Sequence, residues 1–183
     1  MPGYVIHLSV AEEYLKKHPK EKINYNEFIE GVIFPDSVED KSLTHYGKKS
    51  SFTNLYKFLQ DKKLDSDFNR GYFLHLITDY LFYNRYVEVF SKDMYNDYDI
   101  LNKILIEKYN VNLPEKIKQY VFFKDEVENL KILSLSLVET FIEDVSNMQI
   151  DDIANKVNEN PEEWTRIRPL IVISWFFMWI MVK

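Results

Sequence analysis

The sequence contains no cysteine, which excludes disulfide bonds, thiolate nucleophiles and cysteine-ligated zinc sites. It has only four glycines, so the glycine-rich loops that bind nucleotide phosphates are excluded as well. Positive charge is in deficit, with 23 Lys and Arg against 29 Asp and Glu, and a net charge of −6 gives no signal for nucleic-acid binding. No basic segment followed by an apolar stretch begins the chain, so we expect no signal peptide and a cytoplasmic protein.

The remaining composition is that of a globular protein. Hydrophobic residues make up 46% of the 183 residues and charged residues 28%, which is enough apolar material for one core. No stretch has the composition of a domain linker. We therefore expect one domain over residues 1–183, in which residues 1–90 carry the candidate site and residues 91–183 complete the helical fold.

Apolar residues recur every three to four positions, which predicts helices, and no alternating strand pattern exceeds four residues. We expect a second helix to be capped by Asn24 and stopped by Gly31, Asp67 to cap a later one, and Asn110 to end another. The other bounds come from the apolar spacing, and the expected helices cover 9–17, the segment from Asn24 to Gly31, 52–59, 68–86, 93–109, 125–145, 151–157 and 161 onward. Between them, Pro35 to Ser51 is expected to be irregular. The pattern predicts a compact all-α domain of seven or eight helices.

The carboxyl-terminal end carries a run of 13 residues, 170–182 (LIVISWFFMWIMV), which only Ser174 interrupts. As a helix it would be about 20 Å long, short of the roughly 30 Å of a bilayer core. A buried closing helix is therefore the favoured interpretation. Membrane contact through this tail and a protein-binding patch remain as alternatives.

His75 and Asp79 form the first candidate pair for chemistry. They are four residues apart in a predicted helix, so both side chains lie on one face and can reach the same cation. Their neighbours are apolar, and a buried carboxylate needs a partner. A metal ion and a simple His–Asp hydrogen bond satisfy that need equally well. His18, next to Pro19, is expected at an exposed helix end.

Three further residues extend this pair. Asp36 and His45 lie in the irregular stretch, and His7 lies in an apolar context ahead of the first predicted helix. The four glycines are all within five residues of these side chains, which suggests that several segments approach closely there. Three His and two Asp are a ligand set for zinc, iron or manganese. Asp36, His45, His75 and Asp79 could close one site, with Asp79 bridging to a second metal held by His7.

The order His … Gly-x3-Pro-Asp … His … Gly-Tyr-x2-His-x3-Asp resembles the zinc-dependent phospholipase C family, which shares its all-helical fold with single-strand-specific nucleases. The resemblance covers roughly residues 3 to 90. It implies a phospholipase C-like fold and makes His7, Asp36, His45, His75 and Asp79 metal ligands. It also implies that Asp36 is both ligand and general base.

The chain departs from the family pattern because no histidine follows His75, so the family's further His and its His-x3-Glu pair are missing. We therefore expect one or two ions, zinc by resemblance, with iron or manganese also fitting. The predicted function is a metal-dependent hydrolase, a phosphoesterase acting on a small-molecule or lipid phosphoester through a metal-activated water. The alternative is a non-catalytic helical binding or scaffold protein with a structural metal or a His–Asp network.

Overall fold

The computed structural model describes residues 3–125, 130–169 and 171–172, and in these residues the fold is all-α, as predicted. The α-helices are α1 (Tyr4–Lys17), α2 (Tyr25–Ile33), α3 (Lys41–His45), α4 (Leu55–Asp61), α5 (Asp67–Leu81), α6 (Asp93–Tyr109), α7 (Leu135–Ser146), α8 (Ile150–Glu159) and α9 (Pro161–Thr165). Short 3-10 turns are η1 (Phe34–Asp36), η2 (Ser50–Phe52) and η4 (Glu115–Tyr120), and η3 (Phe82–Tyr86) is a π-turn.

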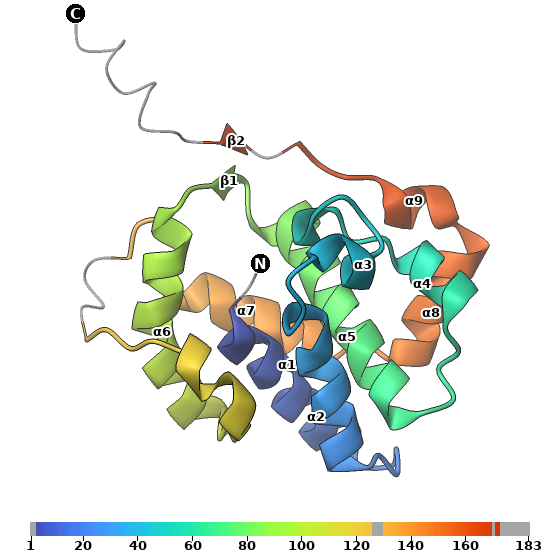
Figure 1. Cartoon of the computed structure of the whole chain (residues 1–183), viewed down its shortest axis with the longest axis horizontal. Coiled ribbons are helices and arrows are strands. Elements are labelled where there is room, and N and C mark those ends of the chain that lie inside the picture. Colours follow the sequence, from blue (N-terminus) through green and yellow to red (C-terminus); the bar gives the residue numbers. More distant parts are fainter. Residues whose placement is uncertain (1–2, 126–129, 170, 173–183) are drawn as a thin grey trace, which may run out of the picture.

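Helix α5 is the centre of the fold. Figure 1 shows it running through the middle of the molecule, with α1 and α2 beside it, α6 at one side and α4, α8 and α9 at the other. Every residue from Gly71 to Leu81 is buried, so this helix has no solvent face over that span. A helix that is apolar nearly all round must be covered by other helices, which explains its central place.

Several helix ends follow from local capping chemistry. Asn24 accepts a backbone N–H at the start of α2, and Asn110, with a φ of 53°, ends α6 in the left-handed conformation. Both were predicted, as were the bounds of α6. The predicted cap of α5 is wrong by one residue, because Ser66 supplies the capping oxygen and Asp67 instead accepts the backbone N–H of Asn24.

The prediction that Gly31 stops a helix is wrong, since α2 continues to Ile33. A Cβ on Gly31 would lie 2.0 Å from the carbonyl oxygen of Phe68, and one on Gly71 would lie 2.0 Å from that of Phe28. The two glycines therefore let the backbones of α2 and α5 touch. The predicted close approach of segments near the glycines is confirmed here.

Three other helix bounds differ from prediction. The first helix begins at Tyr4 instead of Ser9, so His7 lies inside it. The helix predicted over 52–59 is α4, which starts after the capping side chain of Asn54. The helix predicted over 68–86 ends at Leu81 and continues as the π-turn η3. Inside the stretch predicted to be irregular, η1 and the five-residue α3 form.

The helix predicted over 125–145 is wrong in its first half, apart from residues 126–129, which lie outside the described residues. Helix α7 begins only after Ser134, whose hydroxyl caps it. The reason is the buried carboxylate of Asp97 in α6. It accepts the backbone N–H groups of Lys131, Ile132 and Leu133 at 3.0, 2.8 and 2.9 Å, which keeps this segment out of a helix.

Replacing Asp97 with alanine is expected to lower the free energy of unfolding by about 3 kcal/mol, because buried N–H donors would lose a charged acceptor. Urea denaturation measures this change. The matched control is Asp99→Ala on the same helix, where only a surface ion pair with Lys124 at 3.4 Å is lost and the cost should stay below about 1 kcal/mol. Equal effects of the two substitutions would contradict the role of Asp97.

The closing helix predicted over 170–182 falls outside the described residues, except for Ile171 and Val172. These two form β2 (Ile171–Val172), a strand that pairs in parallel with β1 (Val89–Phe90), so no helix forms there. Among the helices of the described part of the chain, none combines the length and the apolar character that a bilayer crossing requires. The cytoplasmic location stays a prediction.

Candidate metal centre

The structure brings all five predicted side chains into one buried cluster. His7 comes from α1, Asp36 from η1, His45 from the end of α3, and His75 and Asp79 from successive turns of α5. Asp36 is 7% exposed, and the other four are at most 1% exposed. Two overlapping triads, His7–His75–Asp79 and Asp36–His45–His75, each have their ligand atoms within 4.8 Å of one another.

The imidazole of His75 is fixed by the neighbouring helix. Its Nδ1 lies 2.7 Å from the carbonyl oxygen of Val32 in the last turn of α2, where carbonyls lack partners within the helix. A carbonyl only accepts, so Nδ1 carries a hydrogen, and in the neutral ring Nε2 presents a lone pair. The close crossing at Gly31 and Gly71 brings α2 near enough for this contact.

His45 is oriented in the same way by its own short helix. Its Nδ1 lies 3.0 Å from the carbonyl oxygen of Lys41, which again leaves Nε2 without a hydrogen. The preceding residue is held on both sides, because the Thr44 hydroxyl donates to Pro35 O at 2.8 Å and Thr44 O accepts from the Tyr72 hydroxyl at 2.5 Å. Such backbone-anchored imidazoles are typical of metal ligands.

The two anchored histidines face each other. Their Nε2 atoms lie 3.2 Å apart, so two lone pairs would repel unless a cation or a proton lies between them. Burial by itself lowers the pKa of His75, yet Asp79 and Asp36 raise it above its ordinary value. The cluster therefore attracts positive charge, and either a metal ion or an imidazolium proton can supply it.

Asp79 and His7 hold the other side of the cluster. No contact of the Asp79 oxygens or the His7 nitrogens has full hydrogen-bond geometry among the described residues, although His45 Nε2 lies 2.9 Å from Asp79 Oδ2 and His7 Nε2 lies 3.5 Å from Asp79 Oδ1. Burial opposes ionisation of Asp79, but the three histidines keep its pKa well below the usual range, so it is a carboxylate. Burial, together with His75, lowers the pKa of His7 to about 4, so this imidazole is neutral at pH 7. Its ring stacks on that of His75, with centroids 3.8 Å apart.

The spacing of the donor atoms fits a shared cation. His45 Nε2 lies 2.9 Å from Asp79 Oδ2 and 3.6 Å from Asp36 Oδ1, and His7 Nε2 lies 3.5 Å from Asp79 Oδ1. Ligand atoms about 2.1 Å from a metal are themselves separated by about 3.0 to 3.4 Å. Nitrogen and carboxylate donors without sulfur suit zinc, iron and manganese.

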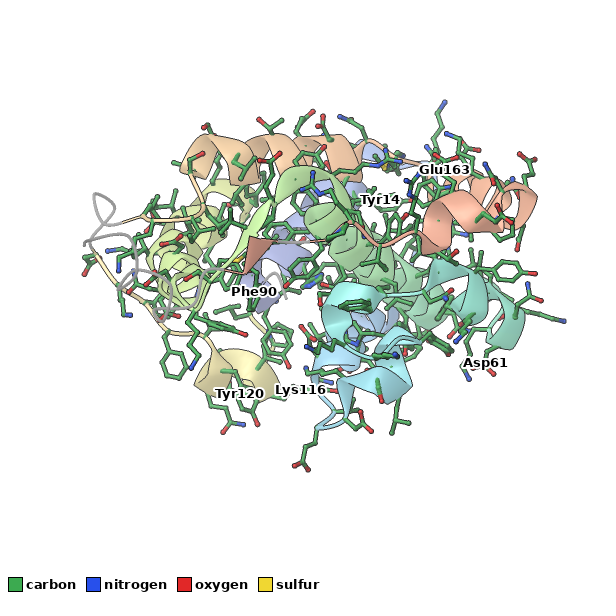
Figure 2. All side chains as sticks on the ribbon, turned by 90° about the horizontal axis from the view of Figure 1, so that it is seen from above. Tyr14, Asp61, Phe90, Lys116, Tyr120 and Glu163 are labelled. Carbon is green, nitrogen blue, oxygen red and sulfur yellow. The ribbon has the colours of Figure 1, made fainter. Side chains whose placement is uncertain are left out.

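Asp36 is the member of the cluster that reaches the surface. Its Oδ1 accepts from Lys41 Nζ at 3.0 Å, and its backbone oxygen accepts from the Tyr4 hydroxyl at 2.8 Å. It lines a cavity of about 600 Å³, whose walls include Tyr4, Ser37, Val38, Glu39, Lys41, Lys116, Ile117 and Tyr120. Figure 2 labels Lys116 and Tyr120 on η4, at the outer side of the molecule. The cluster therefore borders solvent through Asp36.

The tyrosines divide into those that support the site and those that do not. Tyr72 holds the backbone beside His45, as described above. Tyr46 and Tyr80, which also neighbour ligands in sequence, donate instead to Asp61 and to the Glu163 carbonyl. His18 is also less exposed than predicted, because Ser146 O and the Gln149 side chain contact its ring at 2.9 and 2.7 Å.

Two further buried side chains near the cluster, those of Tyr83 and Tyr98, were not predicted from the sequence. The hydroxyls of Tyr83 and Tyr98 lie near each other, and neither makes a hydrogen bond of full geometry among the described residues. Burial, followed by the neighbouring phenol and the charge of Asp79, raises the pKa of Tyr83 well above its ordinary value. Tyr83 follows Asp79 by four residues, so its helical spacing could have indicated it. Tyr98 comes from α6 and no pattern in the sequence marks it.

Comparison with known proteins gives no match to a family model, to a curated protein or to a solved structure.

Proposed function

We propose that this protein is a metal-dependent hydrolase of phosphate esters. The observation that carries the proposal is the pair of backbone-anchored histidines, His45 and His75, whose Nε2 atoms lie 3.2 Å apart beside the carboxylate of Asp79. Such an arrangement is costly without a cation and well formed with one. Zinc is the proposed ion, and iron or manganese fits the same donors.

A divalent cation bound here lowers the pKa of a coordinated water and so supplies a nucleophile near neutral pH. Asp36 is the group that we assign to proton transfer, because it is the one ligand of the five at the cavity. Its Oδ1 is held by Lys41, which orients the carboxylate and leaves it an acceptor. The other four residues hold the ion and exclude bulk water, since they are at most 1% exposed.

The cavity beside Asp36 supports an anionic substrate. Two ammonium groups line it, Lys41, which pairs with Asp36, and Lys116, which pairs with Glu30. Tyr4 and Tyr120 supply aromatic walls with ring centroids 6.4 Å apart. Ammonium groups bind phosphate oxygens, while aromatic rings cover the organic part of an ester. A small-molecule or lipid phosphoester of the class implied by the sequence resemblance fits this chemistry.

Asp36→Asn is expected to lower kcat for hydrolysis of bis(p-nitrophenyl) phosphate by at least about 100-fold, because the amide cannot accept the proton. Metal-loaded protein is assayed by release of p-nitrophenolate. The control is Glu39→Gln, which alters charge in the same cavity without touching the cluster and should keep activity within about threefold. Full activity of Asp36→Asn would remove Asp36 from the mechanism.

The second candidate is a non-catalytic binding or scaffold protein, in which the cluster is a structural metal site or a His–Asp network. Its supporting observation is burial, because structural sites are closed by protein ligands and four of these five residues are at most 1% exposed. The two functions differ in one measurement. Metal-loaded protein that melts lower after chelation, yet hydrolyses no phosphomonoester or phosphodiester, supports the scaffold.

A further inference from the structure

Six buried side-chain atoms lack a hydrogen-bond partner among the described residues, and all six belong to His7, Asp79, Tyr83 and Tyr98. An unpaired buried polar atom costs about 1 to 3 kcal/mol, so such atoms are rare and scattered in most proteins. Here the six unpaired atoms lie in one part of the molecule, which indicates a binding position for a polar ligand.

The positions of the helices bring these four residues together. Tyr83 follows Asp79 by one turn where α5 continues into η3, so the two share a face. Tyr98 of α6 packs its ring against the first turn of α1, with Cγ 3.5 Å from the Cβ position of Gly3. His7 lies one turn further along the same face of α1, with its Nε2 3.5 Å from Asp79 Oδ1.

Whatever pairs with these atoms must accept a hydrogen bond where they donate one, and must donate one or carry positive charge where they accept. A buried phenol at neutral pH keeps its hydrogen and can donate it, and Asp79 is an acceptor that both phenols leave unbonded. Neither nitrogen of His7 is anchored on a backbone carbonyl, unlike Nδ1 of His45 and His75, and its Nε2 has only the 3.5 Å contact with Asp79 Oδ1. A small oxygen ligand is complementary to these groups, because it would accept from two phenols and bind a cation held by His7 and Asp79.

We propose that Tyr83 and Tyr98 donate hydrogen bonds to an oxygen ligand held at the His7–Asp79 side of the cluster, forming a buried oxyanion subsite. The ligand is a water in the free protein and an oxygen of phosphate when phosphate is present. This inference rests on the proposed metal site and assigns its two missing hydrogen-bond donors. Tyr83 and Tyr98 are positioning residues, because they act on the cation's ligand through their hydroxyls alone.

The test uses protein loaded with Co²⁺, whose visible absorption reports the ligands of the ion, and a titration with inorganic phosphate. Tyr83→Phe and Tyr98→Phe keep the rings and remove only the hydroxyls. We expect unchanged cobalt content, an altered spectrum and phosphate affinity about tenfold weaker for each variant. The control is Tyr80→Phe on the same helix, whose hydroxyl donates to the Glu163 carbonyl and which should match the wild type.

Outcomes separate this proposal from the proposed function. If the wild type binds cobalt and phosphate but both phenylalanine variants match it in spectrum and affinity, the subsite is wrong and the metal site stands. If the wild type binds no cobalt, the metal site fails and the subsite fails with it. If the phenylalanine variants change the cobalt spectrum but bind phosphate as tightly as the wild type, the hydroxyls do not bind phosphate. Water is then their only ligand.

Discussion

Replacing His75 with alanine is expected to abolish metal binding, because His75 belongs to both candidate triads of the cluster. Untagged wild-type protein purified without chelator should contain one to two equivalents of metal per chain by mass spectrometry. The variant should contain less than about a tenth of that. A metal present at 100 times its Kd stabilises the fold by about 2.7 kcal/mol. Its loss should lower Tm by about 5 to 10 °C in a chain of this size.

The matched control is His18→Ala, which removes an imidazole that contacts Ser146 and Gln149 and lies outside the cluster. It should keep its metal even if its stability falls. Wild-type protein that contains no metal after reloading would show that these residues form a hydrogen-bonded core. Metal retained in full by His75→Ala would show that the ion binds elsewhere.

Replacing Gly71 with alanine is expected to destabilise the protein by about 3 kcal/mol or more, because the added methyl group would lie 2.0 Å from the carbonyl oxygen of Phe28. Backbone cannot rotate away as a side chain can, so α2 and α5 must separate. His75 Nδ1 then loses the Val32 carbonyl, and we expect weaker metal binding as a second effect. Thermal melting with and without chelator measures both.

Gly3→Ala is the control for a glycine with room for a side chain. Its Cβ would make an ordinary contact with the Tyr98 ring at 3.5 Å. Because Gly3 is the N-cap of α1, where alanine is less favourable than glycine, the free energy of unfolding should fall by less than about 1 kcal/mol. If Gly71→Ala were as stable as Gly3→Ala, the close helix crossing would not be needed for the fold.

Sequence was most informative where structure depends on neighbours along the chain. Asn24 caps α2 through its side-chain oxygen, and Asn110 ends α6 in the left-handed conformation. The bounds of α6 follow from the helical period of its apolar residues. It was least informative where a distant group competes with local preference. The segment before α7 has a helical pattern, yet the Asp97 carboxylate takes its N–H groups from another helix.

The sequence by itself determined the all-α class, the types of the five cluster residues and the facing positions of His75 and Asp79, because these depend on composition and helical spacing. Only the tertiary structure decided the rest. The hydrogen position on His75 depends on the Val32 carbonyl at the end of another helix. The phenol of Tyr98 reaches the cluster from α6, and a contact between separate helices leaves no period in the sequence to predict it.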